Sequence, residues 1–141
     1  MADRLRFELA TPTRLVVGAS ADEVVVPGVE GSFGVLPGHA PLLSLVGIGE
    51  VMYRTGREEH YLAVSGGFAE VGPDHVTILA ETAERPDEID VARARAARDR
   101  AEQRVRSPAG EALDVDRARA AADRAQARLQ VAGRRPGGAA A

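Results

Sequence analysis

The sequence predicts a β + α fold: an antiparallel β-sandwich of about ten short strands, followed by an antiparallel hairpin of two helices. All five aromatic residues lie before Pro86, in a region where apolar and polar residues alternate between glycines and prolines. Alternation with a period of two is typical of half-buried strands. Twelve of the eighteen arginines lie after Pro86, among alanines and acidic residues at helical spacing.

Short apolar runs bounded by turn residues mark the strands of the first part. Leu5, Phe7 and Leu9 alternate with charged residues, and later runs end at glycines or at proline–glycine pairs. Strands are expected at residues 5–9, 15–17, 24–26, 32–36, 42–46, 51–54, 61–65, 68–71 and 76–81. The pair Gly66–Gly67 is expected to be the turn between two of them. Many short strands at close spacing favour a sandwich or a barrel.

The second part carries the start and stop signals of two helices. Asp87 is expected to cap a helix from residue 89 to about 106, because an N-terminal turn favours a side-chain acceptor and negative charge. The segment 107–110 contains a proline and a glycine that end this helix. Asp114 is expected to cap a second helix that runs to about residue 132 and ends at Gly133. The predicted domains are therefore a sandwich at 1–86, a hairpin at 87–133 and a flexible tail at 134–141.

The interior of the predicted hairpin consists mostly of alanine, which favours helix formation but buries little apolar surface. Each helix is expected to persist when undocked, while each buried methyl contributes only about 0.8 kcal/mol. A movable element and a permanently docked one are both compatible with this pattern.

Charge divides the chain at the same place. Residues 1–85 carry a net charge of −6 and residues 86–141 carry +3, which together give −3. A basic arm on an acidic body suggests an acidic partner or an anionic ligand. The chain has no cysteine, no signal-peptide pattern at its start and no long apolar run. We expect an intracellular protein that is soluble or peripheral to a larger assembly.

No set of residues has the pattern of a catalytic or metal site. Lysine is absent, which excludes a phosphate-binding loop of the Gly-Lys-Ser/Thr type. The segment 47–49 lacks the third glycine of a dinucleotide fingerprint, and Ser65 lies between strands rather than at a nucleophile elbow. His39, His60 and His75 lack the spacing of metal ligands. The sequence therefore predicts a protein without catalytic residues and without a required cofactor.

Arginine stripes on both predicted helices are the strongest indication of a ligand. Steps of three and four residues place two sets on one face each: Asp90, Arg93, Ala97, Arg100 and Arg104 on the first helix, and Arg117, Ala121, Arg124 and Arg128 on the second. Arginine forks fit phosphate oxygens, and Asp90 could accept from an amino or hydroxyl group. A solvated, salt-bridged surface is the alternative. A nucleic-acid partner is not expected, because positive and negative charges alternate along the helices and no aromatic residues accompany the arginines.

Three segments resemble one known family. Residues 29–43, VEGSFGVLPGHAPLL, are similar to the signature loop of the epsilon subunit of F-type ATP synthases. Residues 61–71, YLAVSGGFAEV, and 76–84, VTILAETAE, resemble its later strands. The likeness continues through the hairpin, so the chain is identified as a member of this family.

The resemblance implies a non-catalytic rotor subunit of a proton-translocating ATP synthase. It implies that the sandwich binds the gamma subunit and the ring of membrane c subunits, with Ser32 and His39 in the rotor-contacting loop. Many members carry an acidic residue where Ser32 stands. An extended hairpin would reach the alpha and beta subunits of the catalytic head and inhibit ATP hydrolysis. The expected location is the cytoplasmic face of a bacterial plasma membrane, where the protein is peripheral.

The resemblance also implies ATP as a regulatory ligand of the folded hairpin. Some bacterial members bind it through an Ile/Leu-Asp-x-x-Arg-Ala motif, which stands here at residues 89–94. The residues implied are Glu84, Ile89, Asp90, Arg93, Ala94, Arg100, Arg124 and Arg128. The alternative function is a free-standing ATP-sensing regulator that is not part of a rotary complex.

Overall fold

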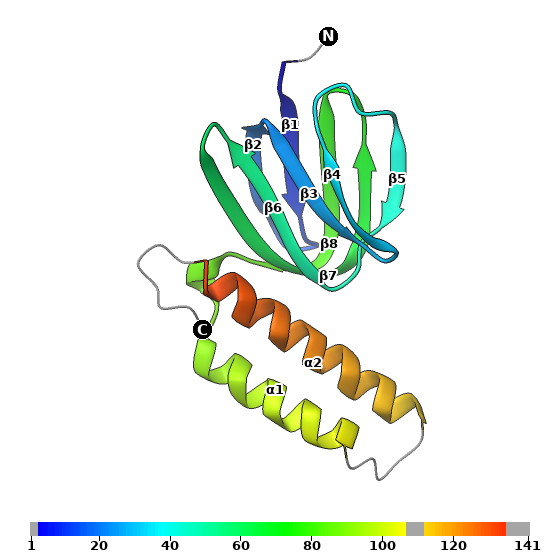
Figure 1. The fold of residues 1–141 in the computed structure, drawn as a ribbon, viewed down its shortest axis with the longest axis vertical. Helices are drawn as coiled ribbons and strands as arrows, with labels where there is room; N and C mark the ends of the chain where they lie inside the picture. The colour runs from blue at the N-terminus through cyan, green and yellow to red at the C-terminus, as the bar shows by residue number, and fades with distance from the viewer. Residues whose placement is uncertain (1–2, 107–111, 135–141) are drawn as a thin grey trace.

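A computed structural model describes residues 3–106 and 112–134. Figure 1 shows a β-structure built from the N-terminal part, with two helices packed side by side below it. The strands are β1 (Leu5–Ala10), β2 (Leu15–Ala21), β3 (Glu23–Gly28), β4 (Gly31–Val35), β5 (Leu42–Leu45), β6 (Gly49–Thr55), β7 (Glu58–Val71) and β8 (His75–Glu84). A 3₁₀ turn (Pro86–Glu88) leads to helices α1 (Val91–Arg106) and α2 (Ala112–Ala132). The predicted sandwich followed by two helices is confirmed.

The strands pair in the order β2-β1-β8-β7-β6-β3-β4, and β5 pairs with β7. Strands β1 and β8 run parallel, from Arg6 beside His75 to Ala10 beside Leu79, whereas the other pairs are antiparallel. The described residues thus form eight strands in a mixed sheet, and the prediction of about ten antiparallel strands is wrong. The parallel pair joins the first strand of the sandwich to the last one. No local pattern in the sequence reveals this pairing.

The glycine pair at 66–67 lies inside a strand rather than at a turn, which accounts for part of the miscount. Strand β7 pairs with β6 over its first half and with β8 from Ala63 to Val71, and its last four residues also pair with β5. Gly66 and Gly67 have φ angles of +66° and +110° at the change of partner, a region that other residues rarely adopt. A Cβ at Gly66 would lie 2.7 Å from the Glu81 carboxyl carbon. These glycines therefore bend one continuous strand.

The alternating residues of the strands build a single core between the two halves of the sandwich. Phe7, Leu9, Val24, Val51 and Ile78 are completely buried. Phe7 and Leu9 come from the inward face that their alternation predicted, since side chains along a strand point to opposite faces. Among the residues whose side chains the structure describes, this core includes none from the helices, so the sandwich does not depend on the hairpin for its apolar interior.

The first helix begins later than predicted, and its cap is Asp90 rather than Asp87. The Asp90 carboxylate accepts a hydrogen bond from the backbone N–H of Arg93 (3.0 Å), and its carbonyl accepts one from Ala94 (3.0 Å). Asp87 lies instead in the 3₁₀ turn, where the Glu88 carboxylate accepts from the backbone N–H of Arg85 (2.9 Å). Proline at position 86 favours this tight turn, so the continuous helix starts after a second capping residue.

The second helix begins at Ala112, so Asp114 lies within its first turn and is not its cap. Its end agrees with the prediction: the N–H of Gly133 bonds to the carbonyl of Leu129 (3.1 Å), and that of Arg134 to Val131 (2.9 Å). The predicted break at 107–110 and residues 135–141 of the predicted tail lie outside the described residues. Arg134 is described, and it contacts the sandwich.

The hairpin docks on the sandwich through a small apolar cluster formed by Ala63, Ile89, Val131 and Ala132. All four side chains are less than 7% exposed, and Tyr61 packs against them. The contact is made mainly by α2, which lies against β7 and β6, whereas α1 packs on α2. A cluster this small stabilises docking by only a few kcal/mol.

Candidate functional site

The motif at the start of the hairpin combines two buried residues with one capping residue. Ile89 is 5% exposed in the docking cluster, and Ala94 is 4% exposed on the side of α1 that faces α2. Asp90 holds the first turn through the backbone of Arg93 (3.0 Å). In the docked hairpin these three residues therefore shape the helix start and its packing.

A shallow pocket where α2 meets β7 and β8 contains three of the residues implied as ATP ligands. Glu84, Arg124 and Arg128 line it together with Ser65 and Thr82, among others. The Nε of Arg128 donates to a carboxylate oxygen of Glu84 over 2.6 Å. Both side chains are about one-third exposed, so the pair is open to a competing anion. This pocket joins the hairpin to the sandwich.

The remaining two arginines of the predicted set lie outside this pocket. Arg93 and Arg100 are exposed on α1 and are not among its lining residues. Buried Ala94 and Ala101 mark the side of α1 that faces α2. At roughly 100° per residue, Arg93 and Arg100 lie about 90–110° from that side, on one common flank. The structure thus brings Glu84, Arg124 and Arg128 together and leaves Arg93 and Arg100 at the surface of α1.

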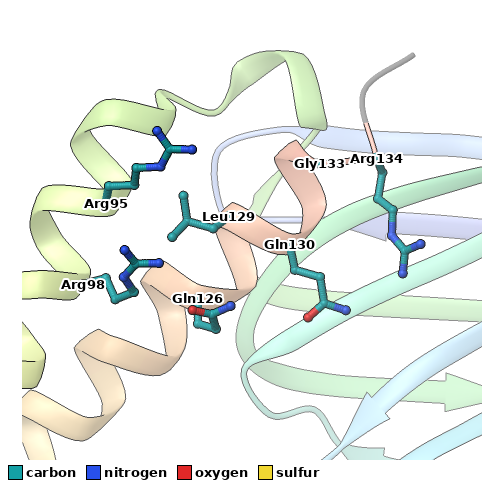
Figure 2. A pocket seen from close by; sticks show the side chains of 7 residues that line it. All are labelled: Arg95, Arg98, Gln126, Leu129, Gln130, Gly133 and Arg134. Carbon is teal, nitrogen blue, oxygen red and sulfur yellow. The ribbon is translucent and has the colours of Figure 1, made fainter. Parts of the chain in front are cut away.

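The opposite flank of the hairpin carries a groove that the sequence reading missed (Figure 2). Arg95 and Arg98 of α1 line it together with Gln126, Leu129 and Gln130 of α2, and Leu129 lies beside the two arginines. The two arginines do not belong to the stripe through Arg93. The feature of the sequence that could have indicated this groove is the pair Gln126 and Gln130, four residues apart on α2.

Two ion pairs at the hairpin–sandwich boundary were also not predicted. Arg134 pairs with Glu50 of β6 (3.2 Å), and its guanidinium lies 4.4 Å from the centre of the Tyr61 ring. Arg14 pairs with Glu88 of the 3₁₀ turn (2.8 Å). These partners are far apart in the chain, so no spacing pattern connects them. Together they hold both ends of the hairpin to the sandwich.

The segment with the predicted rotor contacts is exposed and tied to a neighbouring turn. Ser32 is exposed on β4, and His39 is half-buried in the loop that follows. The His39 Nδ1 donates to the Ala40 carbonyl (2.7 Å), and the Gly38 N–H donates to the carbonyl of Pro73 (2.7 Å). The turn between β7 and β8 therefore supports this loop.

A row of apolar side chains crosses the outer face of the sandwich on five strands. Register places Leu45 beside Phe68, Phe68 beside Leu79, Leu79 beside Ala10, and Ala10 beside Leu15. The four large side chains of this apolar row are 45–63% exposed. Register partners share a face of the sheet, so the row is continuous, and continuous exposed apolar surface is typical of a protein interface.

Within the described ranges, no three His, Cys, Asp or Glu side chains lie close enough to hold a metal ion. Nor is any described helix long and apolar enough to cross a membrane. The pocket at Glu84 and the groove at Arg95 are two of the polar hollows that the described residues form.

Comparison with known families assigns both parts of the chain. Residues 4–86 match the beta-sandwich domain of the ATP synthase delta/epsilon chain, and residues 87–133 match its long alpha-helix domain. The chain belongs to the ATP synthase delta/epsilon chain family. As a member of that family it is a non-catalytic subunit of the ATP synthase.

Curated relatives agree with this membership. The ATP synthase epsilon chain of Koribacter versatilis is 55% identical over 111 residues, which cover 79% of this chain and 78% of that one. The epsilon chain of Nitratidesulfovibrio vulgaris strain DP4 is 51% identical over 105 residues, with 74% and 78% coverage.

Solved structures share the fold of this delta/epsilon family member at low sequence identity. A chain in the Euglena gracilis mitochondrial ATP synthase superposes with a TM-score of 0.81 at 21% identity, covering 94% of this chain and 82% of that one. A chain in the central stalk and c-ring structure of the Tetrahymena thermophila mitochondrial ATP synthase superposes with a TM-score of 0.62 at 12% identity. The match covers 93% of this chain and 98% of that one.

Proposed function

We propose that this subunit belongs to the central stalk of an F-type ATP synthase, turns with the rotor and regulates ATP hydrolysis through its hairpin. The observation that carries this proposal is the division into a self-contained sandwich core and a lightly docked hairpin. Its bacterial relatives favour a peripheral location on the cytoplasmic face of a plasma membrane.

The apolar row is the proposed docking surface for the gamma subunit. It presents Leu15, Leu45, Phe68 and Leu79 on one outer face, and exposed apolar rows of this kind gain stability when a partner covers them. The loop with Ser32 and His39 is the proposed contact with the c-subunit ring. Its backbone tie to Pro73 supports this role, because a loop that transmits torque needs a fixed conformation.

The hairpin is the proposed regulatory element, and the structure contains its docked state. Undocking would break the apolar cluster and the pairs at Glu84 and Glu50. The released arm carries a net charge of +3, which favours acidic surfaces on the alpha and beta subunits of the catalytic head. Contact there would oppose rotation in the direction of hydrolysis.

ATP is the proposed ligand that favours the docked state. The candidate residues are Glu84, Ile89, Asp90, Arg93, Ala94, Arg100, Arg124 and Arg128. Grouping of Glu84, Arg124 and Arg128 in one pocket supports the proposal. The ion pair of Arg128 requires one refinement: phosphate oxygens must compete with the Glu84 carboxylate for that guanidinium. ATP would therefore bind only after Arg128 turns away from Glu84, a pair that already links the hairpin to the sandwich.

A binding assay with purified gamma subunit tests the rotor assignment. The wild-type chain is expected to form a stable complex, and Phe68→Asp is expected to weaken it at least tenfold by placing a charge in the apolar row. Val29→Asp, at a residue that is 59% exposed outside the row, is the matched control. A free-standing ATP sensor is the alternative function, and it would show no gamma binding in any of the three proteins.

A further inference from the structure

The groove on the far flank of the hairpin has the shape of a small-molecule site. It lies between the helices, has a volume of about 340 Å³, and is lined by Arg95 and Arg98 of α1 and by Gln126, Leu129 and Gln130 of α2. Figure 2 shows the Arg95 and Arg98 side chains beside Leu129, whereas the Gln130 side chain extends from the other side of α2. Gly133 and Arg134 also line it.

The charge inside this groove is not balanced by its own residues. None of the described residues that line it carries a carboxylate. Arg98 has one ion-pair partner, the neighbouring Asp99 (3.3 Å), and Arg134 pairs with Glu50 on the sandwich. Within the described ranges Arg95 takes part in no ion pair. Two guanidinium groups held three residues apart, with little compensation, favour an anion between the helices.

We propose that this groove binds a small anion that carries phosphate groups. Guanidinium forks match phosphate oxygens, the two glutamine amides can donate to further oxygens, and Leu129 provides an apolar floor. The volume exceeds that of one phosphate ion, so a diphosphate or longer chain fits better. The site is separate from the predicted ATP residues, because Arg95 lies about 200° around α1 from Arg93.

Binding in this groove would stabilise the closed hairpin. The cationic donors belong to α1 and the amide donors to α2, so separating the helices divides the site. A ligand shifts a conformational equilibrium by its difference in affinity between the two states. Phosphate-bearing ions would therefore favour the closed hairpin independently of any ATP bound beside Glu84.

Nuclear magnetic resonance of the full chain with inorganic pyrophosphate provides a direct test. The chain has three glutamines and no asparagine, so the side-chain amide region contains three pairs of signals. Gln126 and Gln130 report the groove, and Gln103, exposed on α1, is an internal reference. The expected result is a saturable shift of the first two pairs with little change at Gln103. A parallel titration with ATP shows whether the groove binds the phosphates of a nucleotide or only the inorganic ion.

Single substitutions then assign the binding to the groove. Arg95→Gln and Arg98→Gln are each expected to weaken pyrophosphate binding about tenfold, the loss expected for one charge-assisted contact. Arg104→Gln removes the same charge from an exposed position of α1 outside the groove and should change affinity less than about twofold. The backbone spectrum shows whether each variant is folded. Unshifted signals of Gln126 and Gln130, or equal affinity in the Arg95→Gln and Arg104→Gln proteins, would overturn the proposal.

Discussion

Arg128 of α2 donates to Glu84 at the end of β8 over 2.6 Å, and this ion pair links the hairpin to the sandwich. Both side chains are about one-third exposed, which leaves the pair accessible to solvent ions. Both residues also belong to the predicted ATP set. In the docked hairpin they therefore satisfy each other, and a nucleotide must replace an existing contact.

Removing the carboxylate of this pair should loosen the hairpin. Glu84→Gln keeps the size of the side chain but loses the charge-assisted bond, at a cost of about 1 kcal/mol for a partly exposed pair. Hydrogen exchange at the backbone amides of α2 is expected to become about fivefold faster, while exchange in the sandwich core stays unchanged. Glu81→Gln, an exposed position on the same strand, is the control. Equal exchange in both variants would show that the pair does not hold the helix.

The sandwich should fold without the hairpin. No described helical side chain belongs to its core, and a chain that ends at Pro86 keeps the bond from Arg85 to the carbonyl of Val16. Residues 1–86 are expected to show a β-type circular dichroism spectrum, dispersed amide signals and binding to gamma. An unfolded fragment under native conditions would contradict the division into two independent parts.

Deletion of residues 87–141 should raise ATP hydrolysis by the assembled enzyme and leave synthesis largely intact. The reason is the loss of the +3 arm that is proposed to reach the acidic surface of the catalytic head. Steady-state hydrolysis by the complex, measured across ATP concentrations with the full chain as reference, is the assay. If both complexes hydrolyse ATP at the same rate, the hairpin is not inhibitory.

ATP should bind the closed hairpin and oppose its extension. At a hundredfold excess over Kd, a ligand that binds only one state stabilises it by about 2.7 kcal/mol, which is comparable to a lightly docked apolar cluster. Arg93→Ala is expected to weaken ATP binding and favour the inhibitory state. Arg106→Ala, at an exposed position about 220° around α1 from Arg93 and outside both the Glu84 pocket and the groove at Arg95, should affect ATP affinity much less. Calorimetric titration of the three proteins decides the matter, and equal affinity of wild type and Arg93→Ala rules out the role of Arg93.

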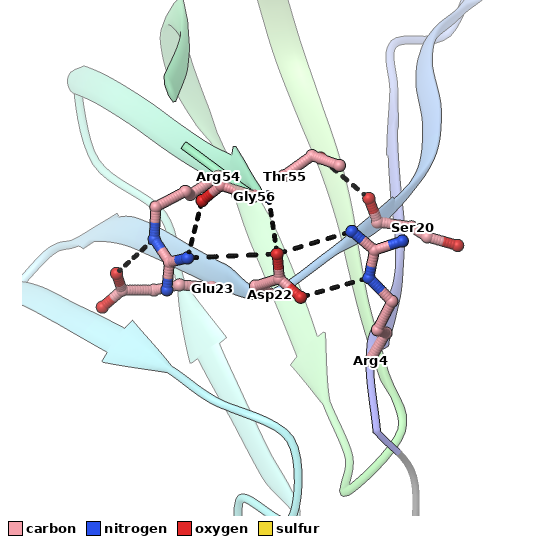
Figure 3. Close-up of polar contacts among 7 residues, drawn as sticks. All are labelled: Arg4, Ser20, Asp22, Glu23, Arg54, Thr55 and Gly56. Carbon is pink, nitrogen blue, oxygen red and sulfur yellow. Dashed lines mark hydrogen bonds and ion pairs between the residues drawn. The ribbon is translucent and has the colours of Figure 1, made fainter. Parts of the chain in front are cut away.

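The stability of the sandwich should depend on the charge of Asp22. Its carboxylate accepts from Arg4 (3.1 Å) and from the N–H of Gly56 (2.7 Å), and Arg54 lies 3.9 Å away (Figure 3). The hydrogen bond from Arg4, followed by that from Gly56, lowers the pKa of Asp22 below its ordinary value of 3.8. A lowered pKa in the folded state adds stability above the ordinary value, and this contribution is lost as the pH falls through the folded value.

Asp22→Asn is therefore expected to unfold more easily than wild type at neutral pH, with a difference that shrinks as the pH falls below 3.8. Urea unfolding at a series of pH values measures this difference. Asp3→Asn, a change at an exposed residue nearby, is the control. A difference between wild type and Asp22→Asn that does not vary with pH would show that the carboxylate charge is not the cause.

Local patterns in the sequence determined the parts of this protein. Alternation placed Leu5, Phe7 and Leu9 in the core, and helical spacing with Gly133 located the end of α2. Such features depend on residues a few positions apart, so they can be read along the chain. The family was identified in the same way, from the motif at residues 89–94 and the signature segments.

Only the tertiary structure decided how these parts meet. The parallel pairing of β1 with β8 and the continuity of β7 through Gly66 depend on partners elsewhere in the sheet. The pair of Arg128 with Glu84 and the groove at Arg95 depend on how the helices lie against each other and on β7 and β8. Helical spacing assigns an arginine to a face of its own helix, but the element opposite that face is set by long-range packing, whose energy no local pattern contains.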